Sequence, residues 1–239
     1  MEMGFEVKGE DKMKRPQLGR EGFTLVELVF VIAIIVVLAG ILIPLALNKL
    51  GEADQARADA DLQGMASALT TFFTDNRHFP ACNTSDCDPL NGTSNDLKIM
   101  VFKGDGSDIT VSDIPPTDAA SGCSVAWNAP GNLVATNSDQ NNAFNHLIIN
   151  DPDGDGNTGQ SGEDYAKWKG PYLGKVGKDP YGNYYVAHIG AIEKNGTPIN
   201  SAGKGYGWVL SAGIDGVFQT CPESTALAGD DTGFIFVSQ

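Results

Sequence analysis

In the middle of the chain, oxygen-bearing side chains recur at every second position: Asp151, Asp153, Asp155 and Asn157. Carboxylate and amide oxygens spaced in this way, with glycines between them, are typical of the start of an EF-hand calcium loop. The match then fails, because the twelfth position is Gly162 rather than glutamate. The segment therefore predicts either a calcium site formed by these four side chains or a solvated aspartate-glycine turn.

The other chemistry-bearing residues form no catalytic pattern. The three histidines, His78, His146 and His188, lie in unrelated sequence contexts. No glycine-rich phosphate loop precedes a helix, and no paired zinc motif or haem attachment motif occurs. We expect the chain not to be an enzyme.

The net charge of −14 is unevenly distributed along the chain. The first 22 residues carry equal numbers of basic and acidic side chains, so the whole excess of negative charge lies beyond them. An acidic body disfavours nucleic acid as a partner, because phosphate contacts need lysine and arginine. It is compatible with solubility and with divalent cations.

All four cysteines lie in the acidic body, at Cys82, Cys87, Cys123 and Cys221. An even number of cysteines in an exported domain favours two disulfides, for which the sequence leaves three connectivities open. We favour Cys82–Cys87, which closes a short loop, together with Cys123–Cys221. The alternative is a set of unpaired, buried thiols in a cytosolic protein.

An almost purely apolar segment covers residues 23–47, with Glu27 as its one ionisable side chain. As a helix it would span roughly 37 Å, which is enough to cross a bilayer. Lys14, Arg15 and Arg20 precede it, so the positive-inside rule predicts that residues 1–22 are cytoplasmic. The acidic body would then lie on the other side of the membrane.

Two further features of this segment are unusual for a simple anchor. Glu27 lies near its start, where a carboxylate in lipid is costly, and Pro44 should kink the helix or melt one turn. The segment is also unlike a secretory signal, because it is too long and no small-x-small cleavage site follows it.

The sequence Gly22-Phe-Thr-Leu-Val-Glu27 after a basic stretch resembles the class III signal of type IV prepilins and pseudopilins. The resemblance implies that a prepilin peptidase cuts after Gly22 and that Phe23 becomes a methylated N-terminus. Glu27 would be the acid inside the membrane. Cleavage creates an amine four residues before Glu27, and the amine of a neighbouring subunit could pair with its carboxylate in a filament. The alternative is that Glu27 reaches the cytoplasmic face by itself.

Beyond the apolar segment, residues 48–77 keep a helical period with one apolar stripe and one charged face. We expect one helix from Phe23 to Asn76, about 80 Å long. A juxtamembrane coiled coil is the weaker alternative, because the stripe lacks sustained heptads. The predicted fold is α+β, a pilin-like lollipop whose long N-terminal helix packs on a small antiparallel β-sheet, with a loop-rich insertion.

Residues 78–165 read as this insertion, and residues 166–239 as the sheet region with a calcium loop. Glycine, asparagine, aspartate and proline are frequent in the insertion. Short apolar runs predict strands or helical turns there, and alternating runs predict strands near the C-terminus. These segments are Leu97–Phe102, Ile109–Ile114, Phe144–Ile149, Tyr184–Ile192, Tyr206–Ser211 and Gly233–Ser238.

The C-terminal blocks KGPYL, DPYGN and SAGIDG, followed by a pair of aspartates, resemble the major pseudopilin of type II secretion. In that family the last loop binds one calcium ion through aspartate side chains and backbone carbonyls. The resemblance implies Asp215 and Asp230 as ligands, with Asp231 and the backbone oxygen of Ser211 as further candidates. The alternative is a solvated acidic loop.

The resemblance further implies a structural subunit of a periplasmic pseudopilus that drives protein export. The expected partners are copies of itself, minor pseudopilins, the prepilin peptidase, the inner-membrane assembly platform and the inner membrane. A type IV pilus subunit for adhesion, motility or DNA uptake is the alternative. A membrane-anchored calcium-binding receptor that never polymerises is a third hypothesis.

Overall fold

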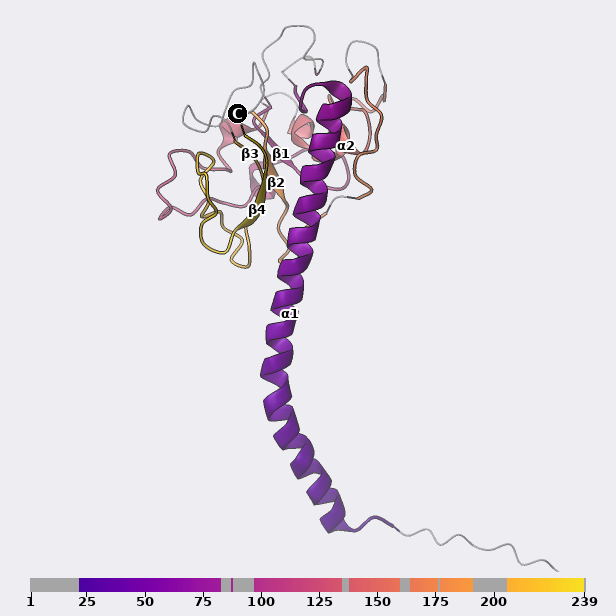
Figure 1. The fold of residues 1–239 in the computed structure, drawn as a ribbon, viewed down its shortest axis with the longest axis vertical. Helices are drawn as coiled ribbons and strands as arrows, with labels where there is room; N and C mark the ends of the chain where they lie inside the picture. Colours follow the sequence, from indigo (N-terminus) through magenta and orange to yellow (C-terminus); the bar gives the residue numbers. More distant parts are fainter. Residues whose placement is uncertain are drawn as a thin grey trace, which may run out of the picture. The chain divides into compact units, whose positions relative to one another are not determined.

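The computed structural model has one long helix and a four-stranded antiparallel sheet, which confirms the predicted α+β class (Figure 1). The described residues are 22–82, 87, 97–134, 138–159, 164–175, 177–190 and 206–238. All of the predicted leader except Gly22 lies outside them, as do residues 191 and 192 of one predicted strand.

The long helix α1 covers Leu25–Asn76 and includes 52 residues. At its start, the Glu27 amide donates to the Thr24 hydroxyl at 3.2 Å, which satisfies one of the free donors of the first turn. At its end, Arg77 takes a φ of 69°, and this left-handed conformation stops the helix. The predicted end at Asn76 is confirmed. The helix is unbroken at Pro44, so the predicted melted turn is absent.

The chain divides into two compact units, Met1–Lys49 and Leu50–Gln239, and α1 contributes to both. In the first unit the apolar side chains of α1 are exposed. The helix contains an 18-residue stretch with a mean hydropathy of 3.3, so it is long and apolar enough to cross a membrane. In the second unit α1 buries one stripe, because residues three and four apart share a helix face. The buried residues are Ala58, Leu62, Met65, Ala68, Leu69, Phe72 and Asn76.

The sheet belongs to the second unit and its strands are ordered as they occur in the chain, β1-β2-β3-β4. The strands are β1 (Ile99–Val101), β2 (Val186–His188), β3 (Tyr206–Ser211) and β4 (Thr232–Ser238). Every neighbouring pair is antiparallel, and a bulge interrupts the β3–β4 register at Gly207/Trp208. The first strand therefore comes from the segment that the sequence indicated as an insertion.

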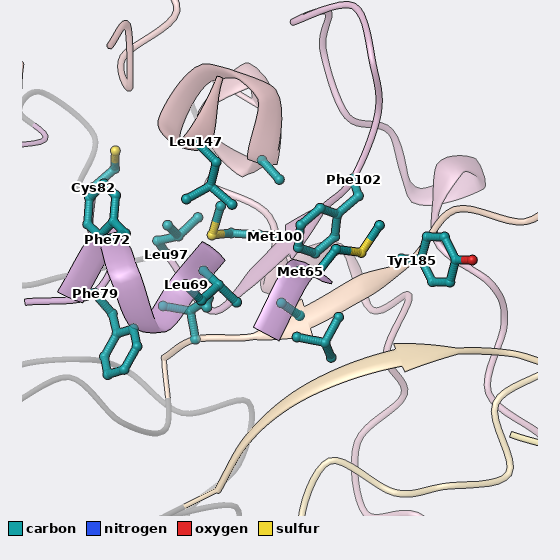
Figure 2. Packing of buried hydrophobic residues seen from close by; sticks show 14 of the residues in the cluster. Met65, Leu69, Phe72, Phe79, Cys82, Leu97, Met100, Phe102, Leu147 and Tyr185 are labelled. Atoms are coloured by element: carbon teal, nitrogen blue, oxygen red, sulfur yellow. The ribbon is translucent and has the colours of Figure 1, made fainter. Parts of the chain in front are cut away.

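Hydrophobic cores lie on both faces of the sheet, because successive strand residues point to opposite sides. Met100, Ala187 and Val209 belong to the core that α1 joins. Figure 2 shows side chains of α1, β1 and α2 packed together in this core. The second core contains Val101, Val186 and other strand residues together with Trp127 and Phe218 from the loops.

The middle of the chain covers the open edge of β1 with short helices and buried asparagines. The side chain of Asn141 donates to the Ile99 carbonyl at 2.7 Å and accepts from the Val134 amide at 2.8 Å. Its neighbour Asn142 caps the next helix by accepting from Phe144. The short helices are η2 (Val111–Asp113), η3 (Pro130–Asn132), η4 (Ser138–Asn141) and α2 (Ala143–Leu147). Two of the predicted apolar runs, Ile109–Ile114 and Phe144–Ile149, therefore contain helical turns.

Candidate functional site

The first functional feature is the exposed apolar surface of α1 in the first unit. Phe23 is 85% exposed, and the large apolar residues that follow as far as Leu47 are exposed as well. A continuous apolar surface of this length needs lipid or other apolar helices around it. Glu27 is the acidic residue in the first turn, which is where the sequence analysis placed it.

The C-terminal loop between β3 and β4 holds two of the predicted calcium ligands by backbone hydrogen bonds. The Asp230 carboxylate accepts from the amides of Ile214, at 2.7 Å, and Asp215, at 3.2 Å. The Asp215 carboxylate accepts from the Val217 amide at 2.8 Å. Asp215 and Asp230 are therefore neighbours across the loop, although 15 residues separate them in the sequence.

Asp231, at the end of this loop, has two carboxylate oxygens in different surroundings. Its Oδ2 accepts from the amides of Gln219 and Thr220, whereas Oδ1 is buried with no hydrogen-bond partner within the described part of the chain. Burial raises the pKa of this carboxyl to about 6. A divalent cation would offset that penalty, because it favours the ionised form.

Ser211 was predicted to contribute its backbone oxygen to a calcium site. In the structure its side chain makes a buried hydrogen bond. The Ser211 hydroxyl donates to Asp179 Oδ2 at 2.7 Å, and the other oxygen of Asp179 accepts from Tyr181 and Asn183. Asp179 thus joins the DPYGN turn to the end of β3. The sequence analysis did not assign it a role, because an aspartate before a proline also suits an ordinary turn.

The middle loop brings three carboxylates together, and two of them were predicted as ligands. Asp151, Asp153 and Asp164 each place an oxygen within 4.8 Å of the others, whereas the C-terminal aspartates form no comparable group among the described residues. Asp155 and Asn157 bond to each other, through the Asn157 amide at 2.7 Å and its side chain at 2.9 Å.

Asp164 was missed because the EF-hand spacing directs attention to the twelfth position of the loop. Asp151 and Asp164 are both buried, and burial together with Asp153 raises the pKa of Asp151 to about 6. Two hydrogen bonds between Asn150 and Tyr165, the chain neighbours of Asp151 and Asp164, bring these residues together without following that spacing.

Both favoured disulfides are confirmed: Cys82 is joined to Cys87, and Cys123 to Cys221. The second joins residues 98 positions apart. Beside it, Glu223 accepts from the amide and hydroxyl of Ser124, at 3.1 and 2.9 Å. The middle of the chain is thereby attached to the C-terminal loop.

Comparison with known proteins gives two similar sequences, both named type II secretion system core protein G. The protein from Escherichia coli K12 is 38% identical over 64 residues, which is 27% of this chain and 44% of that protein. The protein from Pectobacterium carotovorum is 32% identical over 73 residues, 30% of this chain and 47% of that protein. The chain thus spans less than half the length of these relatives.

No protein-family model and no solved structure matches the chain. The resemblance to pseudopilins is nevertheless confirmed by the two relatives over about 30% of the chain, and the fold agrees with it. The chain is therefore pseudopilin-like, and its similarity is to the core protein G of type II secretion systems.

Proposed function

We propose that this protein is the structural subunit of a periplasmic pseudopilus, assembled from the inner membrane to drive protein export by type II secretion. The exposed apolar surface of α1, which begins at Phe23 and carries Glu27 in its first turn, supports this proposal most strongly. The similarity of the chain to two core G proteins supports the same function.

The apolar part of α1 would have two successive environments. Before assembly it crosses the inner membrane once, with residues 1–22 in the cytoplasm and the acidic head in the periplasm. In the filament it packs against the same segment of neighbouring subunits. The aliphatic side chains suit both environments, because neither lipid nor a helix bundle requires polar groups.

Glu27 makes the transfer between these environments favourable. A carboxylate in lipid lacks a counter-charge, and removal of the leader after Gly22 creates an ammonium group on Phe23. The Phe23 amine of a neighbouring subunit then supplies the missing charge. The proposed partners follow from this cycle: the prepilin peptidase, the inner-membrane assembly platform, minor pseudopilins and further copies of the chain.

Mass spectrometry of the mature protein tests the proposal. We expect a chain that begins at a methylated Phe23, and filaments that sediment after membrane solubilisation. Glu27→Gln should abolish filaments, whereas Glu52→Gln, the same change farther along α1, should not. An intact leader in cells with active prepilin peptidase would contradict the proposal, and a surface pilus containing the chain would favour the type IV pilus alternative.

We also propose that the head binds Ca²⁺ through the C-terminal loop, with Asp215, Asp230, Asp231 and the backbone of Ser211 as ligands. The buried Asp231 Oδ1 supports this site. The middle loop is a second candidate, and its ligands would include Asp151 and Asp153. Asp155 and Asn157 stay predicted ligands there, although they bond to each other in the present structure.

Chelation tests calcium binding in a head fragment that begins at Leu50. A chelator should lower its melting temperature, calcium should restore it, and magnesium at the same concentration should not. Asp231→Asn should remove the effect if the C-terminal loop is the site, and Asp153→Asn if the middle loop is. A melting temperature unaffected by chelation would exclude both.

A further inference from the structure

Gln219 contacts acidic residues on both sides of the C-terminal loop, and the family resemblance gave it no role. Its side-chain Nε2 donates to the Asp215 carboxylate. Its backbone amide donates to Asp231 Oδ2 at 2.9 Å. This one residue therefore joins two of the carboxylates that the resemblance implies as calcium ligands.

The remaining polar atom of the Gln219 side chain, its oxygen Oε1, is buried without a hydrogen-bond partner among the described residues. Asp231 Oδ1 is in the same state there. A buried oxygen without a partner is unfavourable, because it has lost its hydrogen bonds to water and gained none in the protein. Two residues that bond to each other thus each carry one such oxygen.

Gly229 shows where Gln219 Oε1 lies. A Cβ built on Gly229, whose φ is +63°, would overlap this oxygen. Gly229 directly precedes Asp230 and Asp231 in the sequence. The amide oxygen therefore lies against the turn that carries these two carboxylates, in space that a side chain at Gly229 would fill.

Calcium needs more oxygen atoms than the ligands implied by the resemblance supply. Ca²⁺ takes about six to eight oxygens, and glutamine side-chain carbonyls are among its usual ligands. Asp215, Asp230, Asp231 and the backbone of Ser211 supply four oxygens if each binds through one atom. A neutral amide adds an oxygen without adding negative charge to three carboxylates that already share one loop.

We propose that the side-chain oxygen of Gln219 is a further ligand of the calcium ion in the C-terminal loop, together with Asp231 Oδ1. The inference rests on the calcium site proposed above and adds a residue to it. The two ends of the Gln219 amide then have separate roles, because Nε2 fixes the Asp215 carboxylate while Oε1 binds the cation.

Calorimetric calcium titration of the full-length chain in detergent tests this ligand. The parent chain and all variants carry Asp153→Asn, so that the middle loop does not contribute. Gln219→Met keeps the length of the side chain but has no oxygen, and it should raise the Kd for calcium roughly tenfold or more. Gln63→Met, the same change at an exposed position of α1, is the matched control and should leave the Kd unchanged.

Gln219→Glu separates a ligand from a residue that only holds Asp215. Glutamate keeps a side-chain oxygen at this position but lacks the Nε2 donor. If the oxygen is a ligand, this variant should bind calcium at least as tightly as the parent chain, because a carboxylate is also a calcium ligand. If Gln219→Met and Gln219→Glu weaken binding by similar factors, Gln219 acts only through Asp215 and the inference is wrong.

The remaining outcomes separate this inference from the calcium site itself. An unchanged Kd in Gln219→Met would overturn the inference and leave the site standing. Absence of calcium binding by the parent chain would overturn both. If near-UV circular dichroism shows that Gln219→Met does not fold, Gln219→Asn takes its place. Its amide is one methylene shorter, so its oxygen no longer reaches the cation and the same rise in Kd is expected.

Discussion

The Tyr185 hydroxyl donates to Asp61 Oδ2 at 3.0 Å and so joins the strand region to α1 across 124 sequence positions. Tyr185 is buried in the core that α1 shares with the sheet. Burial, with the negative charge of Asp61, raises the pKa of Tyr185, so the hydroxyl stays protonated and remains a donor. The contact fixes one flank of α1 against the sheet, beside a pocket that Arg57, Lys175 and Lys178 line.

Tyr185→Phe should destabilise the head by about 1 kcal/mol, because it removes one hydrogen bond while keeping the ring. Urea unfolding of the head fragment measures this change through a lower midpoint with an unaltered slope. Tyr206→Phe is the control, since the Tyr206 hydroxyl makes no hydrogen bond among the described residues. Equal losses of stability from the two substitutions would show that the hydrogen bond between Tyr185 and Asp61 adds no net stability.

The two disulfides should contribute unequally to stability. By loop-closure entropy, the Cys123–Cys221 disulfide, with a separation of 98 residues, should contribute about 5 kcal/mol, and Cys82–Cys87, with a separation of 5, about 2 kcal/mol. The comparison uses two double variants, each with both cysteines of one pair changed to alanine, in thermal and urea unfolding. A larger loss from the short loop would show that strain or packing outweighs chain entropy.

The two buried histidines should each contribute a loss of stability of the head as the pH falls from about 6.5 to about 4. Burial lowers the pKa of His146 and of His188 to about 4, and an unfolded histidine titrates near 6.5. At these two positions the unfolded chain therefore binds more protons than the folded one in this window, so the histidines favour unfolding as the pH falls. The raised pKa values of Asp151 and Asp231, about 6, act in the opposite direction below that pH. Each histidine can contribute at most about 1.4 kcal/mol per pH unit.

Urea midpoints measured across this pH range test the histidine effect. His188 packs edge-on to Trp127, with ring centroids 5.8 Å apart, and its ring nitrogens have no hydrogen-bond partner among the described residues. His188→Phe should therefore remove the loss of stability that this histidine contributes as the pH falls. His146 bonds to the Tyr165 hydroxyl and to the Gln140 carbonyl, so its replacement should also lower stability at neutral pH.

Gly213→Ala should disrupt the C-terminal loop. Gly213 has a φ of +62°, and a Cβ there would lie 2.4 Å from the Asp230 carbonyl oxygen and 2.6 Å from its carboxylate. We expect a loss of about 2 kcal/mol and weaker calcium protection in thermal unfolding. Gly174→Ala, where a Cβ meets nothing within 4 Å, is the control. An unchanged calcium response in Gly213→Ala would argue against calcium binding by this loop.

The sequence predicted those parts of the structure that depend on residues close together in the chain. The helical period fixed the end of α1 at Asn76, and alternation located β3 within its observed bounds. The disulfide pairing was also predicted, although the sequence itself left three choices open. The helix and the strand were predictable from residues close in the sequence, and the disulfides from a choice among three connectivities.

Features that depend on long-range packing were not predictable in the same way. β1 joins the sheet because Ile99–Val101 pairs with β2 from a distant segment, and no periodicity in three residues indicates that pairing. Asp164 lies near Asp151 because Asn150 and Tyr165, 15 positions apart, bond to each other. In the same way, Arg57 and Asp61 of α1 line one pocket with the distant Lys178. At Pro44 the local signal was wrong, because α1 continues through it without a break. The helix-forming apolar residues on both sides outweigh the loss of one backbone hydrogen-bond donor.

The order of the strands has a consequence for how the head matures. The Cys123–Cys221 disulfide encloses β2 and β3, and β4 follows it in the chain. The sheet and this disulfide can therefore be completed only after the chain has been made well past its middle. Until then, the loops around Cys123 and the edge of β3 that later pairs with β4 have no permanent partners.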